Sequence, residues 1–334
     1  MRTVNGTNSG NHCRGTITAA SGRLQSDATL KVTQYKNKVS TEPGLVTAAH
    51  GRHYAVEHSH EELVHCYPRG KKSTCACGDV VDVERSGDNQ GTIRAVHPRT
   101  SLLYRSDRYR QKIIAANITQ AVIVVAGSPA FNEDLLMRCL VACEQQGIKA
   151  VIVLNKVDLA DETARTATRL ALYSTLGYRV EPLCAKRDIS PLRDILRGHK
   201  SVLVGQSGMG KSTIINGLIP DALARTAEIS QALDAGKHTT TSAQLYHLGG
   251  ETSIIDSPGL QSFGLMHVPQ QELVACFREF GPFIGDCRFD DCRHIVEPGC
   301  AVLAAVERAD INPRRWKAYR ELAAELEAKP PAWA

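Results

Sequence analysis

At 334 residues the chain is longer than one hydrophobic core usually organises, so two or three domains are expected. Its 43% hydrophobic and 22% charged residues are typical of a soluble globular protein with a mild net charge of +5, and its apolar runs are shorter than the ~20 residues that span a bilayer. These features exclude a membrane-spanning protein, and because the polar N-terminus has no signal-peptide core, a cytoplasmic location is expected.

The eleven cysteines are scattered and odd in number, which argues against the disulfide framework of a secreted protein. In a reducing compartment a tight group of cysteines indicates a metal site instead. Cys75 and Cys77 have no second pair nearby, so they are expected to be strand residues and not metal ligands. Positive charge is uneven, since residues 94–112 contain six Lys or Arg against one acid, Asp107. Such a segment fits a phosphate-rich partner, although the same pattern is common on solvated surfaces.

The first 38 residues are polar and carry arginines but few large hydrophobic side chains, which predicts a basic disordered arm at 1–38. Contact with RNA and no function at all are equally good interpretations of this arm. Residues 39–111 then show short alternating runs separated by turns, such as 44–48, 52–57 and 91–96. Four or five short strands in this length predict a closed β-barrel, with the OB-fold as the leading candidate.

Beyond the barrel, apolar strands and amphipathic helices alternate. The runs 121–126 and 149–154 are continuous apolar strands of the kind that is buried on both faces of a parallel sheet. Helices are expected after them, at about 132–146 and 161–176. The pattern predicts a doubly wound α/β domain over 112–278, in which ligands bind at the carboxyl ends of the strands.

A phosphate-binding loop of the form G-x-x-x-x-G-K-[ST] lies within this domain, after an apolar strand at 201–204. Glycines are needed because the backbone N–H groups of such a loop turn inward and form an anion site at a helix N-terminus. Lys211 would reach the β- and γ-phosphates of a nucleotide, and the Ser212 hydroxyl would coordinate Mg²⁺. The alternative is a glycine-rich turn without a ligand. The loop consists of Gly205, Gln206, Ser207, Gly208, Met209, Gly210, Lys211, Ser212 and Thr213.

Two further motifs indicate that the base of this nucleotide is guanine. A carboxylate in an N-K-x-D string accepts hydrogen bonds from guanine N1–H and the exocyclic amine, which adenine cannot donate in that arrangement. The loop after the next strand is similar to an S-A-K loop, whose backbone approaches guanine O6. The residues are Asn155, Lys156 and Asp158 of the first string and Cys184, Ala185 and Lys186 of the second.

The phosphate end of the nucleotide is marked by a third motif. Asp256 and Gly259 fit D-x-x-G, in which the carboxylate reaches Mg²⁺ through water and the glycine N–H is free to meet a γ-phosphate. Between this motif and the phosphate-binding loop lies the threonine-rich segment 236–241. One of its threonines, taken as Thr240, would add its hydroxyl to Mg²⁺ when GTP is bound.

The position that often holds a water-orienting glutamine is a leucine, Leu260. A leucine cannot orient water, so slow unaided hydrolysis is expected and another polar group must act. His238 is a candidate general base, because the first switch loop can bring it beside the γ-phosphate. An exposed loop histidine without a role is an equally good interpretation.

The order of these motifs differs from that of an ordinary small GTPase. The N-K-x-D and S-A-K-like strings come before the phosphate-binding loop, so the site must be built by a circularly permuted chain. Such a permutation is physically permitted, because the packed strands and not their covalent order define the pocket. The segment after Gly259, the second switch, then leads directly into the C-terminal residues.

Three cysteines and one histidine close to the C-terminus form a Cys₃His set, in which the four ligands favour tetrahedral Zn²⁺ in a structural role. The alternative is four unrelated core or surface residues. Two helices are expected after the set, at about 301–308 and 313–328, within a zinc-binding helical domain at 279–334. The four residues are Cys287, Cys292, His294 and Cys300.

The permuted order, the preceding barrel and the C-x4-C-x-H-x5-C knuckle resemble the ribosome small-subunit-dependent GTPase family, also called YjeQ. The strings at 205–212 and 237–241 are similar to that family's motifs. The resemblance covers nearly the whole chain from about residue 44. It implies that the protein is a late assembly factor of the small ribosomal subunit and that the subunit stimulates the protein's GTP hydrolysis. It also implies rRNA contacts of the barrel and zinc domains, and a catalytic role for His238.

The leading hypothesis is therefore a monomeric GTP hydrolase that binds the small ribosomal subunit with GTP and is released when GDP forms. A P-loop ATPase or small-molecule kinase is the first alternative, and Asp158 argues against it. An RNA-binding scaffold with a vestigial nucleotide site is the second, and Lys211 and Ser212 argue against that.

Overall fold

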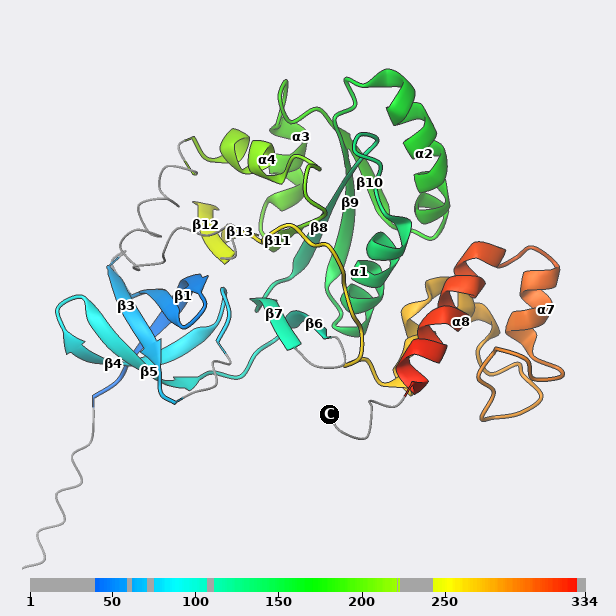
Figure 1. The fold of residues 1–334 in the computed structure, drawn as a ribbon, viewed down its shortest axis with the longest axis horizontal. Coiled ribbons are helices and arrows are strands. Elements are labelled where there is room, and N and C mark those ends of the chain that lie inside the picture. Colours follow the sequence, from blue (N-terminus) through cyan, green and yellow to red (C-terminus); the bar gives the residue numbers. More distant parts are fainter. Residues whose placement is uncertain are drawn as a thin grey trace, which may run out of the picture. The chain divides into compact units, whose positions relative to one another are not determined.

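The computed structural model of the chain describes residues 40–58, 62–70, 75–106, 111–220, 222 and 243–328. The predicted N-terminal arm, His238 and Thr240 lie outside the described residues. In chain order there are a five-stranded β-barrel, an α/β sheet that carries the phosphate-binding loop, and a group of C-terminal helices (Figure 1). The predicted fold class is thus confirmed, with the α/β sheet assembled in permuted motif order.

The barrel strands pair in the order β1-β2-β3-β5-β4, and an additional β1–β4 pairing closes the sheet on itself. Only β3 and β5 pair in parallel among these strands. This is the five-stranded Greek-key arrangement of an OB-fold. Alternate side chains fill the interior, for example Val46, Val64 and Val81. The strands are β1 (Glu42–His50), β2 (His53–Glu57), β3 (Leu63–Pro68), β4 (Val80–Gly87) and β5 (Gln90–Val96).

The structure corrects the expectation for Cys75 and Cys77, which lie in the loop before β4 and not in a strand. The carboxylate of Asp79 holds this loop, because it accepts the Ala76 N–H at 2.7 Å and pairs with Arg99 at 2.7 Å. A short polar side chain that bonds to nearby backbone N–H groups favours a turn over strand pairing. Within the part of the chain that the structure describes, neither cysteine belongs to a metal-type cluster.

A two-stranded hairpin, β6 (Leu102–Ser106) and β7 (Gln111–Ala116), connects the barrel to the α/β sheet. Strand β6 also runs beside the second switch, where the Ser106 N–H donates to the Gly264 carbonyl at 2.9 Å. The predicted domain boundary between residues 111 and 112 falls inside this hairpin, and the domain limits stay a prediction.

The α/β sheet has the strand order β10-β9-β8-β11-β13-β12, in which the first five strands are parallel and β12 is antiparallel. Every residue of β8 is buried, as expected for a strand that is covered on both faces. Strands from the two halves of the chain therefore lie next to each other in one sheet. The strands are β8 (Gln120–Ala126), β9 (Lys149–Asn155), β10 (Arg179–Leu183), β11 (Lys200–Val204), β12 (Ala243–Gly249) and β13 (Thr252–Asp256).

The helices predicted at 132–146 and 161–176 are confirmed to within about a residue at each end. The first begins after Asn132, whose side chain accepts the Leu135 N–H at 3.2 Å and caps the helix. Helix α1 contacts β8 and β9, and α2 contacts β10. The described helices of this part are α1 (Glu133–Gln145), α2 (Ala160–Thr175), α3 (Ser190–Leu196) and α4 (Lys211–Leu218).

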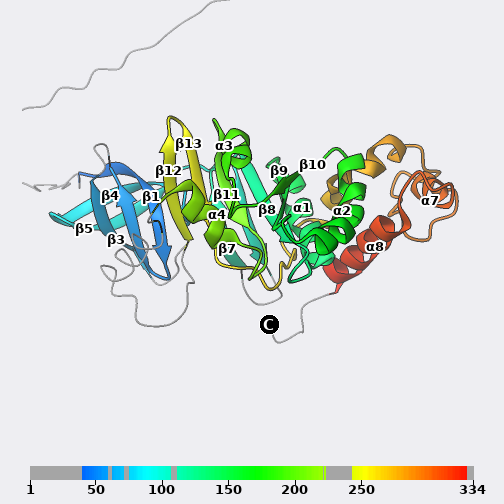
Figure 2. The same ribbon diagram turned by 90° about the horizontal axis from the view of Figure 1, so that it is seen from above.

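The barrel and the α/β sheet are joined through their edges, as Figure 2 shows for β1 and β12. Ala48 pairs with Gln244 and Ala49 pairs with Ala243, both in antiparallel register. Strand β12 thus continues the sheet into the barrel. Its start at Ala243 directly follows the threonine-rich segment in the sequence.

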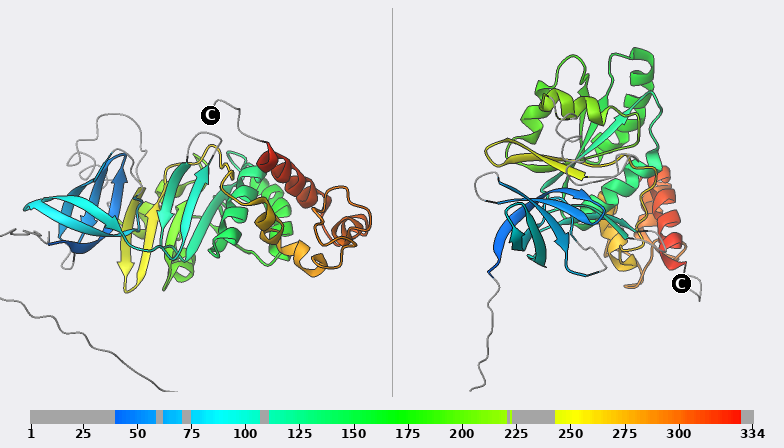
Figure 3. Two further views of the ribbon diagram at one scale, coloured as in Figure 1. Left: turned by 90° about the horizontal axis from the view of Figure 1, so that it is seen from below. Right: turned by 60° about the vertical axis from the view of Figure 1, so that its left-hand side comes forward.

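The C-terminal helices pack beside helix α1, where Arg138 of α1 bonds to Glu325 of α8 at 2.6 Å (Figure 3). A buried pair, Arg315 and Glu279 at 2.6 Å, fixes the helices to each other. The helices predicted at the C-terminus are confirmed. The elements are α6 (Gln270–Leu273), the 3₁₀ helices η1 (Val274–Cys276) and η2 (Arg278–Phe283), α7 (Ala301–Glu307) and α8 (Pro313–Glu327). No helix among the described residues has the length and hydropathy of a bilayer-crossing segment.

Candidate nucleotide site and metal centre

The phosphate-binding loop connects β11 to helix α4 and lies at the carboxyl end of the central strand of the sheet. Two of its glycines have no room for a side chain. A Cβ on Gly205 would lie 2.5 Å from the Val124 carbonyl oxygen, and one on Gly210 would lie 2.3 Å from the Asn155 side-chain nitrogen. Both glycines also have positive φ, of +150° and +95°. The loop therefore follows a path that only glycine permits, close to the neighbouring strands β8 and β9.

Lys211 is the first residue of α4, and its side chain turns back over the loop. Its ammonium donates to the carbonyl oxygens of Gly205 at 2.8 Å and Gln206 at 2.9 Å. The residue is buried, and burial lowers the pKa of Lys211, while the Asp256 carboxylate acts in the opposite direction. Burial likewise raises the pKa of Asp256 to about 6, against the opposing effect of the Lys211 ammonium. The buried Lys211 ammonium and the half-buried Asp256 carboxylate, which belong to two different motifs, thus interact electrostatically at the end of the sheet.

The D-x-x-G segment lies directly on the phosphate-binding loop. The Leu260 N–H donates to the Gly205 carbonyl at 3.0 Å, and the Ser257 hydroxyl donates to the Leu203 carbonyl at 2.7 Å. A Cβ on Gly259 would approach the Ser207 nitrogen to 3.3 Å, so the two loops are in contact. The Leu260 side chain is buried, with 5% of the residue exposed, and has no polar group to offer to a water molecule.

Asn155 is the last residue of β9 and joins three loops. Its side-chain N–H donates to the Met209 carbonyl of the phosphate-binding loop at 2.9 Å, and its side-chain oxygen accepts the Ala185 N–H at 3.2 Å. The residue is only 2% exposed. The N-K-x-D string, the S-A-K-like loop and the phosphate-binding loop are therefore held together by one buried side chain.

Asp158 and Cys184 face each other at the other end of this group, where the Cys184 thiol donates to the Asp158 carboxylate at 3.3 Å. This hydrogen bond is the main cause that lowers the pKa of Asp158, and Arg187 and Lys186 act in the same direction. Asp158 is therefore ionised at neutral pH. Lys156 has a positive φ of +63° and its ammonium donates to the Ser128 carbonyl at 2.7 Å.

The structure places the described residues of the four motifs that were predicted from the sequence at the carboxyl ends of β9, β10, β11 and β13. Ser212 and Thr213 lie in the first turn of α4, and Lys186 is exposed beside Ala185. The sequence analysis missed the loop after β8, although it also follows the carboxyl end of a parallel strand. That loop contributes Ser128, and the Asn132 N–H donates to the Gln206 side chain at 2.7 Å.

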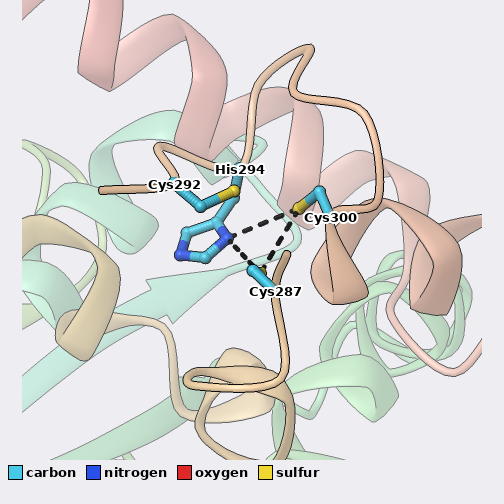
Figure 4. Close-up of side chains that lie close together, drawn as sticks. All are labelled: Cys287, Cys292, His294 and Cys300. Carbon is cyan, nitrogen blue, oxygen red and sulfur yellow. Dashed lines mark hydrogen bonds between the residues drawn. The ribbon is translucent and has the colours of Figure 1, made fainter. Parts of the chain in front are cut away.

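The four predicted metal ligands lie together, and their ligand atoms are all within 4.8 Å of one another (Figure 4). His294 Nδ1 lies 3.5 Å from the sulfur of Cys287 and 3.5 Å from that of Cys300, and these two sulfurs are 3.9 Å apart. A tetrahedral zinc with Zn–S of about 2.3 Å and Zn–N of about 2.0–2.1 Å requires ligand–ligand edges of roughly 3.5–3.8 Å. The spacing of these three ligand atoms therefore fits a zinc ion.

Backbone amides and aromatic side chains hold the loop that carries these ligands. The Ala301 N–H points to the Cys287 sulfur at 3.3 Å, and the Leu303 N–H points to the Cys300 sulfur at 3.4 Å. Amide donors of this kind stabilise thiolates. From helix α8, the Trp316 indole N–H donates to the His294 carbonyl at 3.0 Å. The loop is thus fixed from both sides.

Comparison with known proteins agrees with this arrangement. Residues 96–266 match the model of the RsgA GTPase family. A curated relative named small ribosomal subunit biogenesis GTPase RsgA, from Nitrosospira multiformis, is 50% identical over 283 residues, which cover 85% of this chain and 90% of that protein. A protein of the same name from Nitrosomonas europaea is 48% identical over 291 residues, covering 86% of this chain and 93% of that protein.

Solved structures show the same fold. YjeQ from Thermotoga maritima superposes with a TM-score of 0.66 and 28% identity, covering 87% of this chain and 100% of that chain. YloQ, described as a circularly permuted GTPase, superposes with a TM-score of 0.62 and 26% identity, covering 89% of this chain and 99% of that chain. The resemblance inferred from the motifs is confirmed, and the protein belongs to the RsgA GTPase family.

Proposed function

We propose that this protein is a GTP hydrolase that acts in maturation of the small ribosomal subunit, binds rRNA in the GTP state and is released on hydrolysis. The ribosomal role is supported by the RsgA relatives, which are named small ribosomal subunit biogenesis GTPases. The proposal that a nucleotide binds rests on Asn155, whose side chain links the N-K-x-D and S-A-K-like loops to the phosphate-binding loop. A single guanosine nucleotide fits a site in which these loops are in contact.

Guanine is recognised through Asp158 in this proposal. Its carboxylate is ionised and is held by the Cys184 thiol, so two acceptor oxygens are available for guanine N1–H and the exocyclic amine. The Lys156 stem would lie along the base, and the backbone of 184–186 would approach O6. Adenine offers no pair of donors to the same carboxylate.

The triphosphate and its Mg²⁺ would occupy the concave loop at 205–213. The buried position of Lys211 and Asp256 supports this, because a phosphate favours the charged ammonium and a cation favours the charged carboxylate. Ser212 would ligate Mg²⁺ directly, Asp256 would reach it through water, and Thr240 would complete the set in the GTP state. When bound, Mg²⁺ neutralises charge that develops on the phosphates.

Hydrolysis would need a polar group other than Leu260, which is apolar and buried. His238 is proposed as the group that positions or deprotonates the attacking water. Because Leu260 cannot orient a water molecule, we infer that unaided turnover is slow. The small ribosomal subunit would raise the rate by fixing the switch segments.

The Cys₃His cluster is proposed to hold one structural Zn²⁺ per chain, which supplies a cross-link for a loop without a core of its own. The chain would be organised as an OB barrel at 39–111, a GTPase domain at 112–278 and a zinc-binding domain at 279–334. Barrel and zinc domain would contact rRNA. A cytoplasmic monomer is proposed, since the ribosomal subunit is the partner.

The decisive experiment measures GTP turnover with and without purified small ribosomal subunits. We expect turnover to rise when subunits are added, and Lys211→Ala to abolish it in both conditions. Co-sedimentation with the subunit should be stronger with a non-hydrolysable GTP analogue than with GDP. Turnover that is indifferent to the subunit would contradict the proposed role, and turnover that survives Lys211→Ala would contradict the proposed nucleotide site.

A further inference from the structure

The outer face of the barrel carries an exposed aromatic ring on strand β3. Inward-pointing residues of this strand are fully buried, with Val64 at 0% and Cys66 at 1% exposed. Tyr67 points outward and is 45% exposed. Among the described residues, Phe289 is the only other Phe, Tyr or Trp that is exposed to this degree. The barrel therefore leaves one large ring in solvent, where burial would otherwise be favoured.

The ring is held by a neighbour from the adjacent strand. The ring of His53, at the start of β2, lies edge to face against Tyr67, with ring centroids 5.0 Å apart and an interplanar angle of 64°. Strand β2 is fixed beside β3 by pairs such as Tyr54 with Cys66. The outward position of Tyr67 is thus supported from the side while much of its surface stays accessible.

Two arginines lie close to Tyr67 along the paired strands, and neither has a carboxylate partner among the described residues. Arg52, in the turn between β1 and β2, donates to the Gly70 carbonyl at 2.5 Å, and Arg69 is exposed two residues beyond Tyr67. No carboxylate among the described residues pairs with either guanidinium.

Within the described residues between 40 and 99, the other arginines are paired with acids. Arg85 pairs with Glu42 and Glu62, Arg94 pairs with Glu84, and Arg99 pairs with Asp79. Among these described residues, the arginines without a carboxylate partner are therefore the two near Tyr67. This local excess fits a phosphate-bearing partner.

We propose that Tyr67 is a stacking platform for an unpaired base of single-stranded RNA, with Arg52 and Arg69 contacting the flanking phosphates. This inference rests on the proposed rRNA-binding function and assigns a base contact to it. The outer face of strands β2 and β3 is the surface on which OB-folds bind oligonucleotides. A flat ring beside guanidinium groups suits single-stranded nucleic acid, because stacking tolerates any base and the charges follow the backbone.

RNA is favoured over a protein partner by the residues around the ring. The outward neighbours on β3 and β5 are His65 and Thr92, which offer no continuous apolar patch. A protein anchor would need apolar surroundings that exclude water. A stacked nucleotide needs only the ring and the nearby positive charge.

The test uses the full chain and two probes, the purified small ribosomal subunit with a non-hydrolysable GTP analogue and a labelled single-stranded oligoribonucleotide. Tyr67→Ala should weaken binding of the oligoribonucleotide by about 5- to 100-fold, which corresponds to the loss of one stacked base. Tyr67→Phe keeps the ring and should stay within about twofold of the wild type. Leu63→Ala removes a side chain of similar exposure, 38%, from the same outer face and is the matched control.

The charges are tested separately through salt dependence. Arg69→Gln should weaken binding of every sequence alike and reduce the slope of log affinity against log salt by about 0.7. GTP affinity of all these variants should equal that of the wild type, because none of these residues contacts the described nucleotide loops. Thermal unfolding should change little, because the substituted side chains are exposed.

The failure of this inference can be told apart from that of the proposed function. A wild-type protein that binds neither probe contradicts the rRNA-binding function itself. If the wild type binds both probes and Tyr67→Ala and Leu63→Ala weaken oligoribonucleotide binding equally, only the stacking role of Tyr67 is contradicted. If Tyr67→Ala weakens only subunit binding and leaves the oligoribonucleotide unaffected, the ring contacts a ribosomal protein and the inference is overturned.

Discussion

The side-chain amide of Asn155 donates a hydrogen bond to the Met209 carbonyl at 2.9 Å, although 54 positions separate the two residues in the chain. The same side chain accepts the Ala185 N–H at 3.2 Å. The N-K-x-D loop from the first half of the α/β domain is thereby fixed to the phosphate-binding loop of the second half. Such a contact shows physically how a permuted chain rebuilds one continuous site.

Asn155→Ala is expected to destabilise the protein by about 1–3 kcal/mol, because it leaves a buried carbonyl and a buried N–H without partners. The substitution should also weaken the binding of GTP and GDP alike, by about tenfold or more, because both loops lose the side chain that bonds them together. Chemical denaturation and titration with a fluorescent guanine nucleotide measure the two effects.

The matched control is Asn132→Ala, which removes the N-cap of α1 and should cost about 1 kcal/mol of stability without a loss of nucleotide affinity. If both variants bind nucleotide equally weakly, general destabilisation explains the result and the bridging role of Asn155 is wrong.

Asp158→Asn is expected to reverse the base preference. The amide offers a donor where the carboxylate offered acceptors. The affinity for GTP should therefore fall by about 100-fold or more, while the affinity for xanthosine triphosphate should rise. Competition binding with GTP, xanthosine triphosphate and ATP measures the change. Asp161→Asn, three residues further along in the exposed first turn of α2, is the control and should leave the preference unchanged. Equal affinity of the wild type for ATP and GTP would favour an ATPase or kinase instead.

Local patterns made much of this site predictable. The sequence between β11 and α4 specifies its own structure, because a glycine such as Gly210 is needed at a positive φ wherever the chain passes this close to Asn155. The Cys₃His set was predictable for a similar reason, since its four ligands come from fourteen consecutive residues.

Contacts between segments that are distant in the chain could not be predicted from the sequence. The pairing of β1 with β12 depends on two short runs about 200 residues apart, and neither run specifies its partner. The turn at Cys75 was mistaken for a strand because its structure depends on Arg99, whose ion pair with Asp79 the alternating pattern does not reveal. The bond from Lys156 to Ser128 was missed in the same way.

Acid is expected to loosen the second switch through His267. This ring stacks on Tyr104 with centroids 3.8 Å apart and bonds to the Ser106 hydroxyl at 2.8 Å. Burial lowers the pKa of His267 to about 4, below its ordinary value of 6.5. The unfolded chain therefore binds more protons than the folded chain between pH 6.5 and 4, so stability falls as the pH falls through this window.

His267→Gln keeps a polar partner for Ser106 but cannot titrate. We expect the stability of the wild type, relative to this variant, to drop by about 1–3 kcal/mol between pH 6.5 and 4, as measured by denaturation at several pH values. Parallel pH profiles of the two proteins would show that the buried histidine is not responsible.

Removal of the metal should unfold the loop at 287–300 and leave the nucleotide site intact. The protein is expected to contain about one zinc per chain by elemental analysis. Cys287→Ser should lose the metal, because one thiolate of a closed tetrahedral set cannot be replaced by a hydroxyl at comparable affinity.

Trp316 reports on this change directly, since its indole N–H bonds to the His294 carbonyl at 3.0 Å. A strong chelator or Cys287→Ser should therefore alter tryptophan fluorescence while guanine nucleotide affinity stays within about twofold, because the cluster makes no hydrogen bond to the described nucleotide loops. Cys276→Ser is the control, as this buried cysteine lies outside the cluster and bonds only to the Glu272 carbonyl. Zinc content should survive that substitution. A protein that is metal-free as purified yet keeps the loop protected from proteolysis would show that the four residues stabilise the loop without an ion.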